Sequence, residues 1–302
     1  MNVFYAKIIR SKYALDCQLL AQSSYATIAA AYRITCTLHW TEISMCLIAF
    51  AINSHPKYRL ILTANRDEYR NRETDPVGYW SAAPHLLAGR DRQAGGTWIG
   101  VTTGGKLAAT TNYRDARQQA INPPSRGSLV ADYLSDNAMT PDDLRAYLVK
   151  NGDNYDGFNL LYGSCSELHY FTNRGGSSGP VQPGIHALSN HLLDTHWPKV
   201  VVAKERLNQL LQQPEPSGEE LLSLLSDPAP FVHEQLPDTG IGPERERFLS
   251  PLFIDGDTYG TRSTTAIMVG VDDQVTFLEQ GHDIQRPQLQ KFTFRLSPGG
   301  GR

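Results

Sequence analysis

A cysteine that directly follows a methionine is the residue of this chain best suited to nucleophilic chemistry. Met45 and Cys46 open the apolar run of residues 45–52. If Cys46 were the first residue of the working protein, its free α-amine would lie beside its own thiol and could accept the thiol proton. The pKa of such an amine, about 7.7–8.0, leaves a useful fraction neutral near pH 7. Nucleophile and base would then share one residue.

The 44 residues before Met45 decide whether Cys46 can have a free amine. They are rich in Ser, Ala and Tyr, poor in acidic residues and weakly basic, and they lack the long apolar centre of a secretory signal. Three interpretations stay open: translated upstream sequence with a wrongly chosen start, a cleaved organelle-targeting segment, or a genuine structural extension. We therefore expect an N-terminal extension at residues 1–44 and a single domain at residues 45–302.

The composition is that of an ordinary soluble protein of enzyme size. The 302 residues are 40% hydrophobic and 20% charged, with a formal net charge of −3. Without a basic stripe, nucleic acid is not an expected partner, and without a run of about 18 apolar residues no membrane-spanning helix is expected. Cys17, Cys36, Cys46 and Cys165 match neither a zinc site nor a disulfide framework. This favours a reducing compartment, and we expect a cytoplasmic protein of undetermined oligomeric state.

Apolar segments of strand length occur in pairs joined by short turns, and they alternate with two helical blocks. The predicted strands cover residues 46–52, 58–64, 96–101, 107–113, 158–163, 168–172, 184–190, 263–271, 274–279 and 291–296. The predicted helices cover residues 128–137, 140–150, 198–212 and 218–225, and a polar loop is predicted from residue 69 to residue 91. Short turns imply antiparallel sheets, and two helical blocks suit two covering layers. We expect an α+β fold, a four-layer α-β-β-α sandwich, with a two-layer α+β fold as the open alternative.

Two patterns imitate functional motifs. Residues 100–106 nearly match a phosphate-binding loop, but Leu107 stands where the loop needs Ser or Thr, and a strand-like segment follows instead of a helix. We predict a hairpin turn there. His186, His191 and His196 recur every five residues, which brings them to one face of neither a helix nor a strand, so we predict no metal site.

Four short motifs, in this order and spacing, resemble the NRDE family, also called the transport and Golgi organisation family. They are Met45-Cys46-Leu47-Ile48, Thr63-Ala64-Asn65-Arg66-Asp67-Glu68, Gly95-Gly96-Thr97-Trp98-Ile99-Gly100 and Thr111-Asn112-Tyr113-Arg114. The resemblance covers residue 45 to the C-terminus. It is highly specific to the family and much less specific to an activity.

The family in turn is similar to the N-terminal nucleophile hydrolases, whose fold is the four-layer α-β-β-α sandwich. The nearest branch is the cysteine amidases that cleave bile-salt conjugates, penicillin V and related N-acyl amides. This resemblance implies a site made of a nucleophilic cysteine, an arginine and aspartate at the end of the second strand, and later asparagine and arginine residues. The matching positions are Cys46, Arg66, Asp67, Asn190 and Arg262, with Asn112 as a further candidate.

The resemblance also implies a role for each position. Arg66 would lower the thiol pKa and hold the substrate carbonyl region or carboxylate. Asn190 would donate its amide to the oxyanion, and Arg262 would support the thiolate or bind an anionic leaving group. Asp67 directly follows Arg66, whereas the amidases have a spacer there, and adjacent strand residues point to opposite faces.

Every one of these residues also has a purely structural interpretation. Cys46 reads as a small buried core residue, Arg66 as the partner of a nearby acid, and Asn190 as a turn residue at a strand end. Asn65 and Glu68 are predicted to orient Arg66 or cap the loop, and Trp98 to belong to the core.

Two function classes follow, with a third behind them. The first is a cysteine hydrolase for a non-peptide carbon–nitrogen amide bond of a small or acyl-bearing molecule, which needs no cofactor. The second is a non-catalytic carrier of haem or lipid, in which Cys46 or a histidine would bind the iron. The third is a protein-interaction role with a vestigial site.

Overall fold

A computed structural model describes residues 45–117, 122–282 and 288–297 of the chain. The extension predicted at residues 1–44, which includes Cys17 and Cys36, lies outside the described residues. Two antiparallel sheets dominate the described part, and every strand in them pairs antiparallel to its neighbours.

The first sheet has six strands in the order β10-β1-β2-β11-β12-β13. Their bounds are β1 Met45–Ile52, β2 Tyr58–Tyr69, β10 Gly184–Leu188, β11 Tyr259–Gly270, β12 Gln274–Gly281 and β13 Leu289–Arg295. The second sheet has seven strands in the order β3-β4-β5-β6-β7-β8-β9. Their bounds are β3 Thr74–Trp80, β4 Ala83–Asp91, β5 Ile99–Thr102, β6 Lys106–Asn112, β7 Phe158–Ser164, β8 Glu167–Thr172 and β9 Gly179–Pro180.

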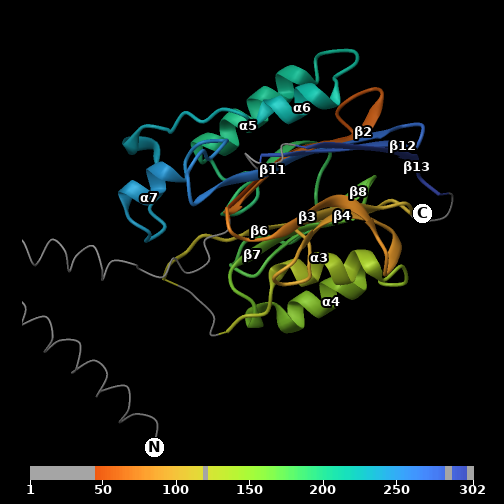
Figure 1. The fold of residues 1–302 in the computed structure, drawn as a ribbon, viewed down its shortest axis with the longest axis horizontal. Helices are drawn as coiled ribbons and strands as arrows, with labels where there is room; N and C mark the ends of the chain where they lie inside the picture. Colours follow the sequence, from red (N-terminus) through yellow and green to blue (C-terminus); the bar gives the residue numbers. More distant parts are fainter. Residues whose placement is uncertain (1–44, 118–121, 283–287, 298–302) are drawn as a thin grey trace, which may run out of the picture. The chain divides into compact units, whose positions relative to one another are not determined.

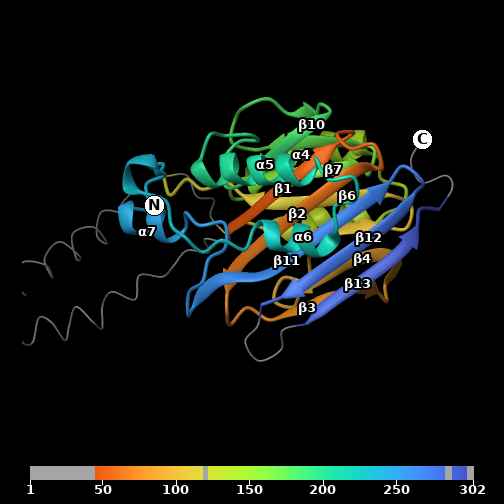
Figure 2. The same cartoon turned by 90° about the horizontal axis from the view of Figure 1, so that it is seen from above.

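The two sheets face each other, and helices cover both outer faces (Figure 1). Helices α5 (Pro198–Leu210) and α6 (Gly218–Leu224) pack on the six-stranded sheet, as Figure 2 shows from above. Helices α3 (Arg126–Ser135) and α4 (Pro141–Asn151) pack on the seven-stranded sheet. The predicted four-layer α-β-β-α sandwich is therefore confirmed. Within the described ranges, no helix combines the length and the apolar character needed to cross a membrane.

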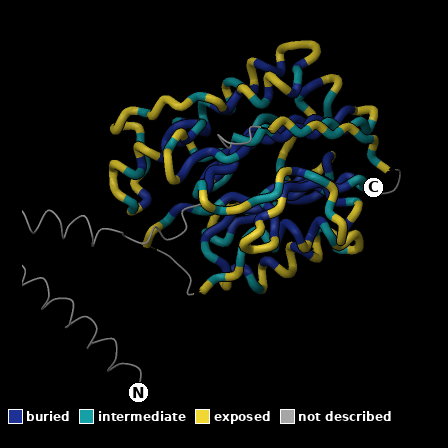
Figure 3. Tube along the Cα trace, in the orientation of Figure 1, coloured by how far each residue is buried: buried dark blue, intermediate teal, exposed yellow. Residues whose placement is uncertain are grey.

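Strand β1 is buried on both faces, which explains why its sequence is apolar at every position instead of alternating. Ile48, Phe50 and Ile52 point into the core between the sheets, whereas Leu47 and Ala49 point into the core beneath the helices. A strand buried on both faces gains stability from apolar residues at every position. Figure 3 shows the burial this produces: both sheets are largely dark blue, and exposed residues gather on the outer turns and helix faces.

Three sequence predictions need correction. The polar loop predicted from residue 69 to residue 91 contains strands β3 and β4. Strand β3 lacks the apolar alternation that predicts a strand. It is an edge strand that contains Pro76, and its register shifts between Asp75 and Gly78. Strand β2 does not end at Ala64 but continues through the Asn65–Glu68 tetrapeptide to Tyr69.

The third correction concerns a short helix. Helix α7 (Pro243–Phe248) was not predicted, because its six residues are mainly charged and have no apolar periodicity. The other helices lie within two residues of their predicted bounds. Helix α4, for example, begins at Pro141 behind a capping box formed by Thr140 and Asp143.

The core between the sheets gives a first testable prediction. Phe277 of β12 is fully buried in that core. We expect Phe277→Ala to lower the free energy of unfolding by about 3–5 kcal/mol, because the lost transfer energy adds to the cost of a cavity. Urea denaturation measures this change. The control is Val271→Ala at an exposed position, which should stay within about 0.5 kcal/mol of the wild type.

Candidate functional site

Cys46 and Arg66 are direct cross-strand partners at one end of the six-stranded sheet. Cys46 pairs with Arg66 in the register of β1 and β2, so their side chains share the face that looks toward the second sheet. The same face carries Ile48 and Phe50 further along β1. Cys46 is 7% exposed, and the thiol therefore lies at the border of the core between the sheets.

Arg66 is a buried cation with incomplete pairing. It is 4% exposed, and its guanidinium stacks on the Trp98 ring at 4.4 Å. Its Nη2 lies 3.8 Å from Glu68 Oε2 and 3.6 Å from Asp91 Oδ2, both longer than a hydrogen bond. Its Nη1 is buried and has no hydrogen-bond partner within the described ranges. A buried guanidinium N–H without an acceptor is costly, and a water molecule or a ligand oxygen would relieve that cost.

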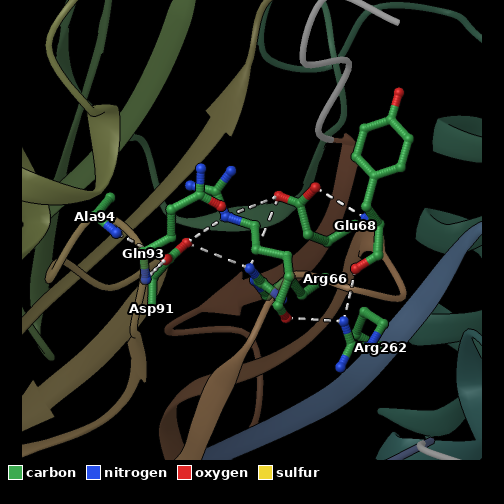
Figure 4. A network of polar contacts seen from close by, with 8 residues as sticks. Arg66, Glu68, Asp91, Gln93, Ala94 and Arg262 are labelled. Carbon is green, nitrogen blue, oxygen red and sulfur yellow. Dashed lines mark hydrogen bonds and ion pairs between the residues drawn. The ribbon is translucent and has the colours of Figure 1, made fainter.

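The surrounding network fixes Arg66 in this position (Figure 4). Asp91 Oδ2 accepts a 2.6 Å bond from Arg72 Nε, which also lies 3.7 Å from Glu68 Oε2. The other oxygen of Asp91 accepts from the backbone N–H groups of Gln93 and Ala94. Burial by itself would raise the pKa of Asp91, but the Ala94 N–H and Arg72 outweigh it and hold that pKa below its usual value. Asp91 therefore remains an anion beside Arg66.

The Trp98 ring packs against the flat face of the Arg66 guanidinium. It packs against the core between the sheets, as the sequence predicted, and Gly89 makes room for it, since a Cβ on Gly89 would lie 2.4 Å from its ring. An aromatic face below a guanidinium stabilises the charge without using its N–H groups.

Arg262 does not join Cys46. Its Nη1 donates to the carbonyl oxygens of Tyr69 at 2.7 Å and Arg72 at 3.0 Å (Figure 4). The register of β11 with β2 shifts between Thr261 and Ser263, so Arg262 sits on the irregularity and leaves the regular alternation. In this position it stabilises the turn after β2.

Asp67 points to the face opposite Arg66, as strand alternation predicts. Its Oδ1 accepts a 2.6 Å bond from Thr261 Oγ1. Asn65, on the same face, donates to the carbonyls of Leu225 and Leu252 on the helical side. Burial raises the pKa of Asp67 to about 6, although the nearby cation of Lys199 opposes that shift.

Hydrogen bonds through Ser189 link Asn190 to the backbone carbonyl of Cys46, and Asn190 in turn binds the backbone carbonyl of Asn112. Ser189 Oγ donates to the Cys46 carbonyl at 3.3 Å and to Asn190 Oδ1 at 3.0 Å. Asn190 Nδ2 donates to the Asn112 carbonyl at 3.0 Å, which joins the end of β10 to the end of β6. Asn190 is fully buried, so its amide is held in one orientation next to β1.

Two buried ionisable residues near this centre were missed by the sequence reasoning. Lys199 of α5 is 2% exposed and donates to the Leu249 carbonyl at 2.9 Å. Burial, followed by the positive charge of Arg114, lowers the pKa of Lys199 to about 8. A lysine in the first turn of a helix carries no sequence signal of such burial. The burial of Glu279 could have been predicted, because it follows Val275 and Phe277 at the alternate positions of β12 that point into the core.

Glu279 adds a second incompletely bonded group near Arg66. Its Oε1 accepts from the Val77 N–H at 2.8 Å. Its Oε2 and the Ser263 hydroxyl, which lies across from Arg66 in the strand register, are buried without a hydrogen bond of normal geometry to the described residues. Arg66 Nη1, Ser263 Oγ and Glu279 Oε2 are thus three buried polar atoms around one centre whose bonding is incomplete.

Burial controls the state of the thiol itself. It raises the pKa of Cys46 to about 12, and Asp67 adds to the rise, whereas Arg66 and the Asp67 N–H oppose it. At neutral pH Cys46 is therefore a thiol, and attack on a carbonyl requires a base that removes its proton.

The chain matches one family model over most of its length. The model, described as Transport and Golgi organisation 2, matches residues 45–283. The Transport and Golgi organization 2 homolog of Mus musculus is 34% identical over 279 residues, which cover 83% of this chain and 99% of the mouse protein. Transport and Golgi organization protein 2 of Drosophila melanogaster is 27% identical over 260 residues, which cover 78% of this chain and 92% of that protein.

Two solved structures align with the chain at low identity. One is a Caenorhabditis elegans ortholog of N-acylethanolamine-hydrolyzing acid amidase, with a TM-score of 0.43 and 13% identity over 74% of this chain and 92% of its own. The other is a mutant conjugated bile acid hydrolase from Clostridium perfringens, with a TM-score of 0.43 and 7% identity over 84% of this chain and 97% of its own.

The burial of Glu279 predicts a specific pH dependence of stability. Burial raises the pKa of this carboxyl to about 7, above the value of about 4.3 in an unfolded chain. The folded protein then holds the proton more tightly, so the free energy of unfolding falls as the pH rises from about 4.5 to about 7. We expect Glu279→Gln to gain about 3 kcal/mol relative to the wild type across that window.

Urea denaturation at pH 4.5, 6 and 8 measures the difference between wild type and Glu279→Gln. Glu205→Gln, at an exposed position of α5, controls for the loss of one negative charge at the surface. A constant difference between the wild type and Glu279→Gln at all three pH values would contradict the assignment of a buried neutral acid.

Proposed function

This chain belongs to the Transport and Golgi organisation 2 family, and we propose that it is a cysteine hydrolase with an N-terminal nucleophile. Its substrate is a small or acyl-bearing molecule with a non-peptide carbon–nitrogen amide bond. The observation that carries the proposal is the pairing of Cys46 with Arg66, whose buried Nη1 has no hydrogen-bond partner in the described part of the chain. A carbonyl or carboxylate oxygen bound there would lie beside the sulfur.

The reaction follows from the atoms of Cys46. The α-amine takes the thiol proton, and the sulfur forms a bond to the amide carbon, whose oxygen becomes an oxyanion. The carbon–nitrogen bond then breaks as the ammonium returns a proton to the leaving amine, which leaves a thioester. Water, activated by the same amine, attacks the thioester and releases the carboxylic acid and the thiol.

The neighbours of Cys46 take positioning and electrostatic roles in this proposal. Asn190 donates its amide to the oxyanion, and the Ser189 and Asn112 contacts hold it in place. Asp67 lies opposite Met45 in the register of β1 and β2. We assign it to hold the α-ammonium of a chain that begins at Cys46.

The free amine is the condition for turnover. With a pKa of about 12, the buried thiol is protonated at neutral pH and is a weak nucleophile by itself. A chain in which Met45 still precedes Cys46 has an amide nitrogen there, which is no base. Activity should therefore appear only in protein whose first residue is Cys46.

Acylation of the thiol gives a test with a matched control in the same chain. Cys46 and Cys165 are both buried, free cysteines, and burial raises the pKa of each to about 12. We expect protein that begins at Cys46 to be acylated by a fatty-acyl p-nitrophenyl ester at Cys46 alone. Cys46→Ala should abolish labelling, and Cys165→Ala should leave the labelling rate within about twofold. Peptide mass mapping measures the site.

Intact mass before the reaction identifies the first residue of each preparation, and circular dichroism checks that the variants fold. Labelling that survives in Cys46→Ala, or that is as fast in protein retaining Met45, would reject the nucleophile and its amine base.

A second candidate function comes from the family description, which names transport and no reaction. A carrier of haem or lipid would use the region around Cys46 without chemistry. Burial of Cys46, which is 7% exposed, raises the pKa of its thiol and so disfavours the thiolate that would bind iron. A cytoplasmic location remains part of the proposal in either case.

Haem titration separates the carrier from the hydrolase. We expect no change in the haem absorption spectrum that depends on Cys46, because a protonated buried thiol is a poor ligand. Wild type, Cys46→Ala and Cys165→Ala are titrated with haem under reducing conditions. A saturable spectral shift that is present in the wild type and Cys165→Ala but absent from Cys46→Ala would favour the carrier.

A further inference from the structure

A small polar pocket lies beside Arg114. The charged residues that line its cavity of about 110 Å³ are Arg114, Arg117, Asp115 and Asp238, and the aromatic ones are Tyr113, His191 and Trp197. A water molecule has a share of about 30 Å³ in the liquid, so the cavity has room for three or four waters or one small oxyanion. The backbone N–H of Arg114 donates to the Asn190 carbonyl at 2.7 Å. This bond connects the pocket to the segment that follows β10, next to Cys46.

Arg114 is a buried cation whose donors are mostly unused. Its side chain is 4% exposed, and its Nη2 forms an ion pair with Glu246 Oε2 at 3.1 Å. Nε and Nη1 are buried, and no residue in the described ranges accepts a hydrogen bond from them. A guanidinium with two unbonded N–H groups is expensive to bury, because these groups lost water and gained no acceptor.

Glu246 faces Arg114 with one oxygen only, because Oε2 lies 3.1 Å from Nη2 and is itself buried without a hydrogen bond of normal geometry to the described residues. Its other oxygen, Oε1, already accepts from the Thr239 backbone N–H at 2.8 Å and from the Thr239 hydroxyl at 2.5 Å. The paired, two-bond geometry that carboxylates usually offer to arginine is therefore not formed. An acceptor for Nε and Nη1 has to come from elsewhere.

Aromatic side chains surround the guanidinium of Arg114 and keep water away from it. The guanidinium stacks on Trp197 at 4.6 Å, and the His191 ring lies between Trp197 and Tyr113, with ring centres 5.5 and 4.9 Å away. Burial and then the charge of Arg114 lower the pKa of His191, so this ring is neutral near pH 7. An aromatic surrounding of low dielectric makes the field of the cation reach further than it would in water.

We propose that this pocket binds a small oxyanion, the carboxylate or phosphate group of a ligand, through the unused N–H groups of Arg114. The Nε–H and Nη1–H groups point to different sides of the planar guanidinium, so each would donate a single charge-assisted hydrogen bond to an oxygen of such a group. The site goes beyond the hydrolase function, and it does not require Cys46 to be a nucleophile.

Thermal unfolding in the presence of simple anions tests the site. The full chain is titrated with inorganic phosphate or with acetate at pH 7.5, and sodium chloride keeps the ionic strength constant. A ligand that binds only the folded state raises the unfolding midpoint in a saturable way. We expect this for at least one of the two probes. A response to phosphate alone assigns a phosphate group, and a response to acetate assigns a carboxylate.

Two variants of the pair separate recognition from folding. Arg114→Lys keeps the charge next to Glu246 but loses the Nε and Nη1 donors, and it should weaken binding about tenfold or more. The double variant Arg114→Gln with Glu246→Gln removes both charges together, which avoids leaving one buried ion alone. It should fold, as circular dichroism would report, and should lose the anion response.

The controls are Arg92→Gln, which removes an exposed arginine paired with Asp75, and Cys46→Ala. Both should keep the wild-type response, so that a failed hydrolase proposal and a failed anion site give different results. Equal responses in the wild type and the double variant, or no response beyond that to chloride, would overturn the proposal.

Discussion

The buried charge of Arg66 is the constraint on which the candidate site depends. Strand pairing fixes this guanidinium opposite Cys46, where it is almost free of solvent. Burying an unpaired charge is costly, and Glu68, Asp91 and the Trp98 ring offset that cost from three directions. They do so at ion-pair distances and through a ring face, so they stabilise the charge and still leave an N–H group without an acceptor.

Strand alternation divides the polar residues of this region into two groups. Arg66, Glu68 and Glu279 belong to the face between the sheets, whereas Asn65 and Asp67 belong to the face under the helices. Each group has its own acids and its own cation, Arg66 on one side and Lys199 on the other. Cys46 stands at the end of β1, where charges from both groups influence the thiol.

The charged residues under the helices lie close to the ion pair of Arg114 with Glu246. Helix α7 supplies Glu246 and helix α5 supplies Lys199, so two segments outside the sheets complete the charge balance behind β10 and β6. Figure 2 shows α7 beyond the ends of the strands of the six-stranded sheet. The Thr111–Arg114 motif thereby serves two sites at once: the Asn112 carbonyl orients Asn190, and Arg114 lines the adjoining cavity. The distance in sequence between these partners explains why the motif alone did not reveal a pocket.

The sequence by itself determined the alternation of strand pairs with helical blocks, the antiparallel pairing of most strands and the place of Cys46 at the start of an apolar strand, because these follow from local apolar patterns and short turns. It left open whether the sandwich has four layers or two. It also determined that Asp67 faces away from Arg66, because alternation is a local rule. Only the tertiary structure decided which charges meet. Arg262 lies at a strand irregularity and donates to the carbonyls of Tyr69 and Arg72. Strand β3 was not predicted because it is an edge strand that contains Pro76. Lys199 and Glu246 became site neighbours through contacts that join distant segments. Such contacts depend on how the layers pack, and a local pattern contains no information about that packing.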